Sequence, residues 1–246
     1  MEDLNQIRDI VYNNTLKGDE STETFFTAFR SNINNLELCK NILEIPNEPD
    51  YFKNFASNYF RFIINDFLPS FSCIKEAESI IDWINTYLIS QIDTVSNFIC
   101  TELAAAEAMI FARFFCVNLR DFFEEKISCF SNFYRNPMTL QNGIFIYKEF
   151  ITIFRSCTDS RIFKDFCESS LNTFFYVSKE TLLEFRDENC PLYSLPPDKL
   201  HLIIQTLCSN LSHTINFKMN DDSIATHIDQ AFKENFSDPD FITFLF

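Results

Sequence analysis

Apolar residues recur at steps of three and four along most of the chain, which is the spacing of one face of an α-helix. The clearest stripe consists of Ile74, Ala77, Ile81, Ile84 and Leu88. Phenylalanine-rich stripes with the same spacing run through 25–33, 52–67 and 162–177. The positions that we expect in the core between neighbouring helices include Ile81, Ile84, Leu88, Phe163, Phe166 and Phe174.

Proline, glycine and acidic residues divide these stripes into a series of predicted helices. Gly18 follows the first helix, Pro46 follows the third, and Pro49 suits the first position of the fourth. Helices are predicted over 3–16, around 25–33, and over 36–45, 49–67, 74–88, 94–118, 121–134, 139–154, 157–177, 197–211, 221–234 and 238–246.

The glycine content and the spacing of the helices define the fold class. Only 2 glycines occur, Gly18 and Gly143, whereas sheets need turn glycines in quantity, so we predict an all-α fold. Helix pairs recur roughly every 30 to 50 residues without a clear sequence repeat. This spacing favours a HEAT- or armadillo-type α-solenoid that forms a single domain over 1–246. A compact bundle with one core is the structural alternative.

Charge and cysteine usage limit the partners and the compartment. The formal net charge is -15, which repels nucleic acids and attracts basic proteins. The alternative is that this charge only keeps a phenylalanine-rich protein soluble. The 9 cysteines include no C-x-x-C pair and no secretory signal opens the chain, so we predict free thiols in a reducing compartment. The most apolar window, 103–119, carries Glu107 and Arg113 and is expected to be a buried helix, without membrane insertion.

No catalytic, cofactor-binding or metal-binding site is predicted. The 3 histidines, His201, His213 and His227, lack the spacing of a metal site. The chain contains no G-x-S-x-G, G-K-[ST] or G-x-G-x-x-G motif. We therefore do not expect an enzyme, although an all-helical enzyme or lipid-binding domain stays open as a third possibility.

Five segments, taken in order, resemble a known family. They are LELCKNILE (36–44), IIDWINTYLIS (80–90), SCTDSRIFKDFCESSLNTF (156–174), LSHTINFKMNDDS (211–223) and AFKENFSDPDFITFLF (231–246). Together they resemble the amino-terminal region of the importin-β superfamily of nuclear transport receptors. The similarity is to its exportin-seven and exportin-four branch, which includes the Ran-binding protein sixteen/seventeen group. The phenylalanine-rich stripes depart from the aliphatic cores typical of that family.

The resemblance implies a fold and a set of partners. Antiparallel HEAT-type pairs would occupy 4–34, 36–67, 72–118, 121–154 and 161–216, with a partial sixth pair at 222–246. The first helices of the pairs would form a convex face and the second helices a concave one. The implied partners are the small GTPase Ran in its GTP form, protein cargo and nuclear pore proteins, and the implied location is shuttling between nucleus and cytoplasm. Members of the family are several times longer, so the chain is expected to be an amino-terminal piece.

Polar positions opposite the phenylalanine stripe in the second helix of each pair are the candidate contacts with Ran. They are Glu23, Thr27, Arg30, Asn34, Asn54, Asn58, Arg61, Asn65, Asn97, Thr101 and Glu102. The alternative is a HEAT- or armadillo-type helical scaffold for protein–protein interaction unrelated to Ran. At the end of the chain, Phe241, Phe244 and Leu245 are expected either to fold back onto the preceding pair or to form an exposed apolar patch.

Overall fold

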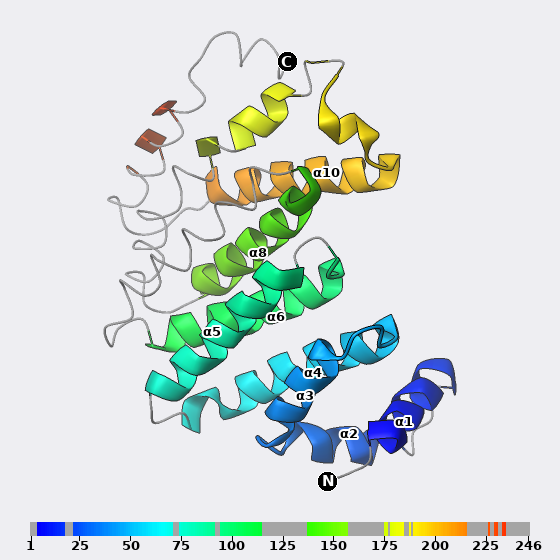
Figure 1. Ribbon diagram of the computed structural model, residues 1–246. Coiled ribbons are helices and arrows are strands. Elements are labelled where there is room, and N and C mark those ends of the chain that lie inside the picture. The colour runs from blue at the N-terminus through cyan, green and yellow to red at the C-terminus, as the bar shows by residue number, and fades with distance from the viewer. Residues whose placement is uncertain are drawn as a thin grey trace. The chain divides into compact units, whose positions relative to one another are not determined.

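The structure is a computed structural model (Figure 1), and it describes residues 4–17, 22–70, 74–91, 94–114, 137–156, 175–176, 178–184, 187, 189–215, 226, 229–230 and 233–234. Every regular element within these residues is a helix, so the predicted all-α class is confirmed. The chain divides into two compact units, Met1–Arg113 and Phe114–Phe246, which are described separately below as unit 1 and unit 2.

Unit 1 is built from helices joined by short connections. They are α1 (Leu4–Lys17), α2 (Glu23–Arg30), α3 (Asn35–Glu44), α4 (Asp50–Phe67), α5 (Ile74–Gln91) and α6 (Asn97–Phe114), with the 3-10 turn η2 (Leu68–Ser70) after α4. All six helices were predicted from the sequence, with boundaries that differ by a few residues.

Local chemistry explains where these helices begin and end. Ile45 is extended (φ -66°, ψ 122°), the conformation that a following proline favours, so α3 ends before Pro46 as predicted. Asn47 then adopts a positive φ of 60°, which asparagine tolerates better than most residues. Pro49 was predicted to be the first residue of the fourth helix. In the structure it is the residue just before α4, which begins at Asp50. The Ser96 hydroxyl accepts the Ile99 N–H at 3.3 Å, so α6 starts at Asn97 rather than at Thr94.

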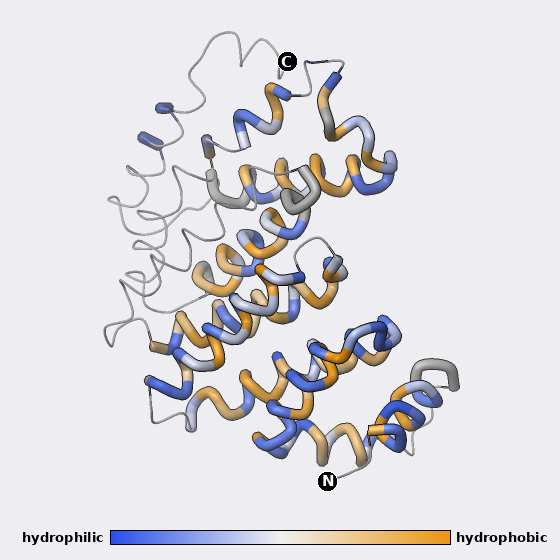
Figure 2. Tube along the Cα trace, in the orientation of Figure 1, coloured by the Kyte–Doolittle hydropathy of each residue, from blue (hydrophilic) through white to orange (hydrophobic). Residues whose placement is uncertain are grey.

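Helix α4 lies at the centre of unit 1. It packs most extensively on α3 and also contacts α1 and α2. The Phe60 ring stacks on Trp83 of α5 at 5.2 Å, and the Asn58 amide reaches Glu102 of α6. Helix α4 therefore touches each of the other helices of unit 1. Apolar and polar segments alternate along α3, α4 and α5 (Figure 2), as expected for helices with one buried face.

The core of unit 1 agrees with the sequence analysis wherever it is described. Ile81, Ile84 and Leu88 are fully buried, which confirms three of the expected core positions. The predicted buried helix is also confirmed, because α6 buries an uninterrupted run from Leu103 to Ala108. Within that run the Glu107 carboxylate accepts a hydrogen bond of 2.5 Å from the Asn85 side chain of α5. A charged residue type is thus accommodated in an apolar helix by a buried amide partner.

Unit 2 contains α8 (Pro137–Ser156), η5 (Pro191–Ser194) and α10 (Pro197–Ile215), with further helical residues at 175–176 and 178–184. Helix α10 packs on α8, and the buried Asn210 amide donates to the Ile144 carbonyl at 3.2 Å. The Phe150 and Phe154 rings meet edge to face at 5.4 Å. Phe163, Phe166, Phe174, the predicted helix at 121–134 and the terminal segment 241–246 lie outside the described residues.

Candidate binding surface and pocket

Aromatic rings join α2 to α4. Phe26 and Phe29 of α2 lie with ring centroids 5.2–5.8 Å from Phe55 and Tyr59 of α4. Offset and edge-to-face pairs at this separation stabilise a contact beyond the area they bury. The aromatic seam, as we call it, consists of Phe25, Phe26, Phe29, Phe52, Phe55, Tyr59 and Phe62. It explains the phenylalanine-rich stripes of these two helices as packing between neighbours.

Polar side chains join α4 to α6. The Ser96 hydroxyl donates to the side-chain Oδ1 of Asn54 at 3.5 Å, and the Asn58 side-chain amide donates to Glu102 Oε2 at 3.4 Å. Arg61 Nε approaches the same oxygen of Glu102 at 2.6 Å, as an ion pair without the angles of a hydrogen bond. The polar seam is the set of Asn54, Asn58, Arg61, Ser96 and Glu102. It joins α6 and the residue before it to α4 through two long hydrogen bonds and one close ion pair, with no contact between rings.

The two seams meet at Phe62. The Arg30 guanidinium of α2 lies 4.6 Å from the Phe62 ring centroid, and Arg61 lies 5.3 Å from it. Arg30 also forms a bidentate ion pair with Asp66 of α4. The hydrogen bonds from Arg30 hold the pKa of Asp66 below its ordinary value, and the pairing raises the pKa of Arg30. Polar side chains therefore join α2 to α4 through Arg30 and Asp66, and join α4 to α6 through the polar seam, with the Phe62 ring between the two groups. We call these two groups of polar side chains the polar strip.

The candidate Ran contacts differ in how far this strip includes them. Those that the seams or the Arg30–Asp66 pair bring together are Arg30, Asn54, Asn58, Arg61, Asn65 and Glu102. Asn97 and Thr101 are half-buried on α6. Glu23, Thr27 and Asn34 are exposed and lie outside both seams. Glu102 departs from the expectation of an outward-facing position, since it is only 7% exposed and neutralises Arg61.

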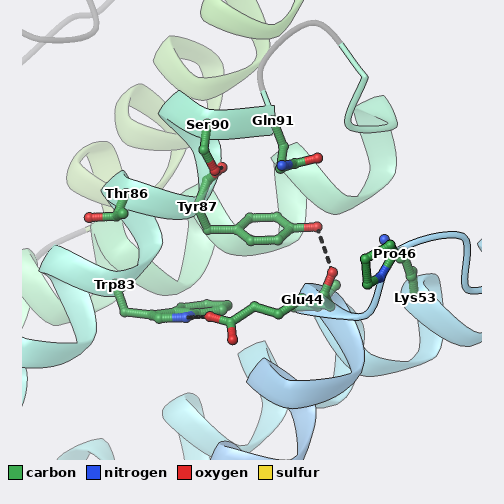
Figure 3. Close-up of a pocket in the computed structure, with 9 residues that line it drawn as sticks. Glu44, Pro46, Lys53, Trp83, Thr86, Tyr87, Ser90 and Gln91 are labelled. Atoms are coloured by element: carbon green, nitrogen blue, oxygen red, sulfur yellow. Dashed lines mark hydrogen bonds between the residues drawn. The ribbon is translucent and has the colours of Figure 1, made fainter.

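A second feature, which the sequence analysis did not identify, is a pocket beside Trp83 (Figure 3). Its volume is about 240 Å³. The residues that define this Trp83 pocket are Leu43, Glu44, Pro46, Lys53, Trp83, Thr86, Tyr87, Ser90 and Gln91. They come from the end of α3, the start of α4 and the second half of α5. The one feature of the sequence that pointed to this pocket was the pair of large aromatic residues, Trp83 and Tyr87, four positions apart on a predicted helix.

Hydrogen bonds fix the side chains of this pocket. Trp83 Nε1 donates to Glu44 Oε1 at 2.6 Å, and the Tyr87 hydroxyl donates to the Leu43 carbonyl at 3.4 Å. The Ser90 hydroxyl donates to the Tyr87 carbonyl at 2.9 Å. Burial, and to a lesser extent the charge of Glu44, raises the pKa of Tyr87 to about 12. The Tyr87 hydroxyl therefore keeps its proton at neutral pH and remains a donor to Leu43.

No group of three or more His, Cys, Asp or Glu side chains is placed to hold a metal ion in the part of the chain that the structure describes. His201 is exposed on α10, while the side chains of His213 and His227 are outside that part. None of the described helices is long and apolar enough to cross a membrane.

Comparisons of the chain with protein-family models, with curated proteins and with solved structures give no significant match. The resemblance to nuclear transport receptors therefore depends on the five segments quoted above. Two of them, 36–44 and 80–90, correspond to α3 and α5, and most of the other three lies outside the described residues.

Proposed function

We propose that the protein is a non-catalytic scaffold of stacked helix pairs, α1–α2, α3–α4 and α5–α6 in unit 1, of the HEAT or armadillo type. The contacts between successive pairs support this arrangement. Trp83 of α5 bonds to Glu44 of α3, so the first helices of the second and third pairs are neighbours, whereas α1 packs on α4. Helix α4 contacts α2 and α6, so second helices are neighbours too. Like-on-like contact between successive pairs is the packing of a solenoid, in which no pair buries its apolar face alone.

The proposed partner is the small GTPase Ran in its GTP form, bound on the face of α2, α4 and α6. The observation that carries this proposal is the polar strip, which draws side chains from all three second helices of unit 1. The choice of Ran as this partner comes from the resemblance of five segments of the chain to nuclear transport receptors. The net charge of -15 supports a partner with a basic surface. Cargo and nuclear pore binding, with shuttling between nucleus and cytoplasm, belong to the same proposal.

The mechanism is recognition of one nucleotide state. A scaffold that makes more contacts with the GTP form than with the GDP form binds and releases its partner as the nucleotide changes, and only this difference in affinity gives a direction to transport. The alternative proposal is a helical scaffold of the same HEAT or armadillo type with an unrelated protein partner.

Calorimetric titration with Ran loaded with a GTP analogue or with GDP distinguishes the two proposals. The first predicts that the GTP form binds at least about tenfold more tightly, a coupling of roughly 1.4 kcal/mol. Equal affinity for the two forms, or binding of neither, would exclude the Ran proposal and leave the unrelated partner.

A matched pair of charge-reversal variants tests whether the partner binds on the face of α2, α4 and α6. Glu23 on α2 and Glu76 on α5 are both exposed, and replacement of either by lysine changes the net charge equally. We expect Glu23→Lys to weaken binding of the GTP form several-fold and Glu76→Lys to leave it unchanged. An equal loss in both variants would mean that overall charge, and not the α2–α4–α6 face, controls the affinity.

A further inference from the structure

The Trp83 pocket has an unusual balance of hydrogen-bonding groups. The Tyr87 and Ser90 hydroxyls each donate their single proton to a backbone carbonyl of the protein. What their oxygens can offer to a ligand is therefore their lone pairs. Glu44 accepts one hydrogen bond from Trp83 through Oε1, and a carboxylate can accept several more. These three side chains thus present acceptors to an incoming group, whereas Lys53, Thr86 and Gln91 of the same lining also carry donors.

The walls of the pocket favour a flat cation. Figure 3 shows Tyr87 above the Glu44 side chain, which runs toward Trp83, with Ser90 and Gln91 above and Lys53 and Pro46 at the opposite side. The Trp83 and Tyr87 rings stack at 5.4 Å with an interplanar angle of 21°. Phe60 also stacks on Trp83 at 5.2 Å, and Lys40 Nζ lies 5.5 Å from a Trp83 ring centroid. An incoming cation is therefore attracted by the ring surface that these neighbours leave open and by the negative charge of Glu44.

The size of the pocket favours a side chain over a whole metabolite. Sites for drug-sized ligands have volumes of about 300–1,000 Å³, whereas this pocket has about 240 Å³. A guanidinium group carries five N–H donors in a planar fork, which suits a carboxylate, several hydroxyl acceptors and an aromatic wall at once. A lysine ammonium has three donors and no flat face.

We propose that the Trp83 pocket binds an arginine side chain from a partner protein, with the guanidinium on Glu44 and against the Trp83–Tyr87 rings. Lys53 lines the same pocket and opposes a cation there, so it limits the affinity. This proposal goes beyond the proposed function and does not depend on Ran. The pocket is made by α3, α4 and α5, and a short peptide is sufficient to test it.

Trp83 provides the readout because it is the only tryptophan of the chain. The experiment titrates the full chain with the capped tripeptide acetyl-Gly-Arg-Gly-amide at constant ionic strength and follows tryptophan fluorescence. The matched peptides contain citrulline, which is neutral and nearly isosteric with arginine, or lysine. We expect a saturable change in the millimolar range with arginine, no saturation with citrulline, and at least about threefold weaker binding with lysine.

Two charge-matched variants locate the response. Glu44→Gln retains an acceptor for Trp83 but loses the negative charge. We expect this variant to bind the arginine peptide roughly tenfold more weakly than the parent protein does. Glu76→Gln changes the net charge equally at an exposed site outside the pocket and should leave binding unchanged. Lys53→Gln should strengthen binding about two- to threefold by removing the opposing charge. Circular dichroism checks that each variant is folded.

The proposal is overturned if citrulline binds as well as arginine, if no peptide gives a saturable change, or if Glu44→Gln and Glu76→Gln behave alike. Equal binding of lysine and arginine would overturn the assignment of a guanidinium. None of these results bears on GTPase binding, and a failure of the GTPase titration does not alter them.

Discussion

Helix α4 contacts its two neighbouring second helices in two different ways. Toward α2 it presents Phe55 and Tyr59 to other rings, and toward α6 it presents Asn58 and Arg61 to Glu102. Burial of rings is favourable without a partner of matched charge, whereas an ion pair must first lose water from both groups. We infer that the aromatic seam supplies stability and that the polar seam sets how α6 lies on α4.

The largest expected effect is the loss of a ring from the aromatic seam. Phe29 is 3% exposed and contacts Phe55 and Tyr59. Phe29→Ala should lower the free energy of unfolding of unit 1 by about 3–5 kcal/mol, because it removes apolar burial and leaves a cavity. Urea unfolding followed by Trp83 fluorescence reports on unit 1. Phe98→Ala is the control, since Phe98 is 44% exposed. Equal losses in the two variants would contradict the seam.

Removal of one partner of the Arg61–Glu102 ion pair should lower the free energy of unfolding substantially. Replacement of both partners by apolar residues should change it little. Glu102→Leu leaves the half-buried Arg61 without its partner and should cost about 1–3 kcal/mol of unfolding free energy. The double variant Arg61→Met with Glu102→Leu should return to within about 1 kcal/mol of the parent protein. The same urea titration measures both. A double variant that loses the sum of both single effects would show that the pair adds net stability.

The aromatic seam should be sensitive to alkali. Burial raises the pKa of Tyr59, and the charge of Arg30 lowers it by less. The folded protein therefore holds the Tyr59 proton more tightly than the unfolded chain does. This contribution is complete below the ordinary tyrosine pKa of about 10 and is lost as the pH rises through the folded value. Stability measured from pH 9 to 11 should fall less steeply in Tyr59→Phe than in the parent protein. Tyr12→Phe, which removes the hydroxyl of an exposed ring, is the control variant.

The smallest expected effect concerns the exposed ion pair at the edge of the aromatic seam. Arg30 and Asp66 side chains are 39% and 34% exposed, so solvent screens their attraction. Asp66→Asn should cost no more than about 0.5 kcal/mol at neutral pH. The lowered pKa of Asp66 means that this small contribution is present above the ordinary aspartate pKa and is lost as the pH falls through the folded value. Asp9→Asn on α1 is the exposed control. A loss above 1 kcal/mol would place this pair in the core of the seam.

Helix positions and core faces could be predicted because they depend on local spacing. The stripe of α5 identified Ile81, Ile84 and Leu88 as core residues, and the structure buries all three. Pro46 marked the end of α3 for an equally local reason, the restriction that a proline places on the residue before it.

The candidate sites could be predicted only in part because they depend on contacts between distant residues. Glu102 meets Asn58 across a sequence separation of 44 residues, and Trp83 meets Glu44 across 39. Helical periodicity assigned Glu102 to a polar face, but it could not show that α4 covers this face. For the same reason, the Trp83 pocket has no signature in any one segment of the chain.

Amide hydrogen exchange with and without Ran carrying a GTP analogue tests the binding face most directly. The account predicts slower exchange in the second helices, at residues 23–30, 50–67 and 97–114, and unchanged exchange in α5, at residues 74–91. GDP-loaded Ran should give little protection at the same concentration. Protection confined to α5, or no difference between the two nucleotide forms, would contradict the proposal that α2, α4 and α6 form a surface for the GTP-bound partner.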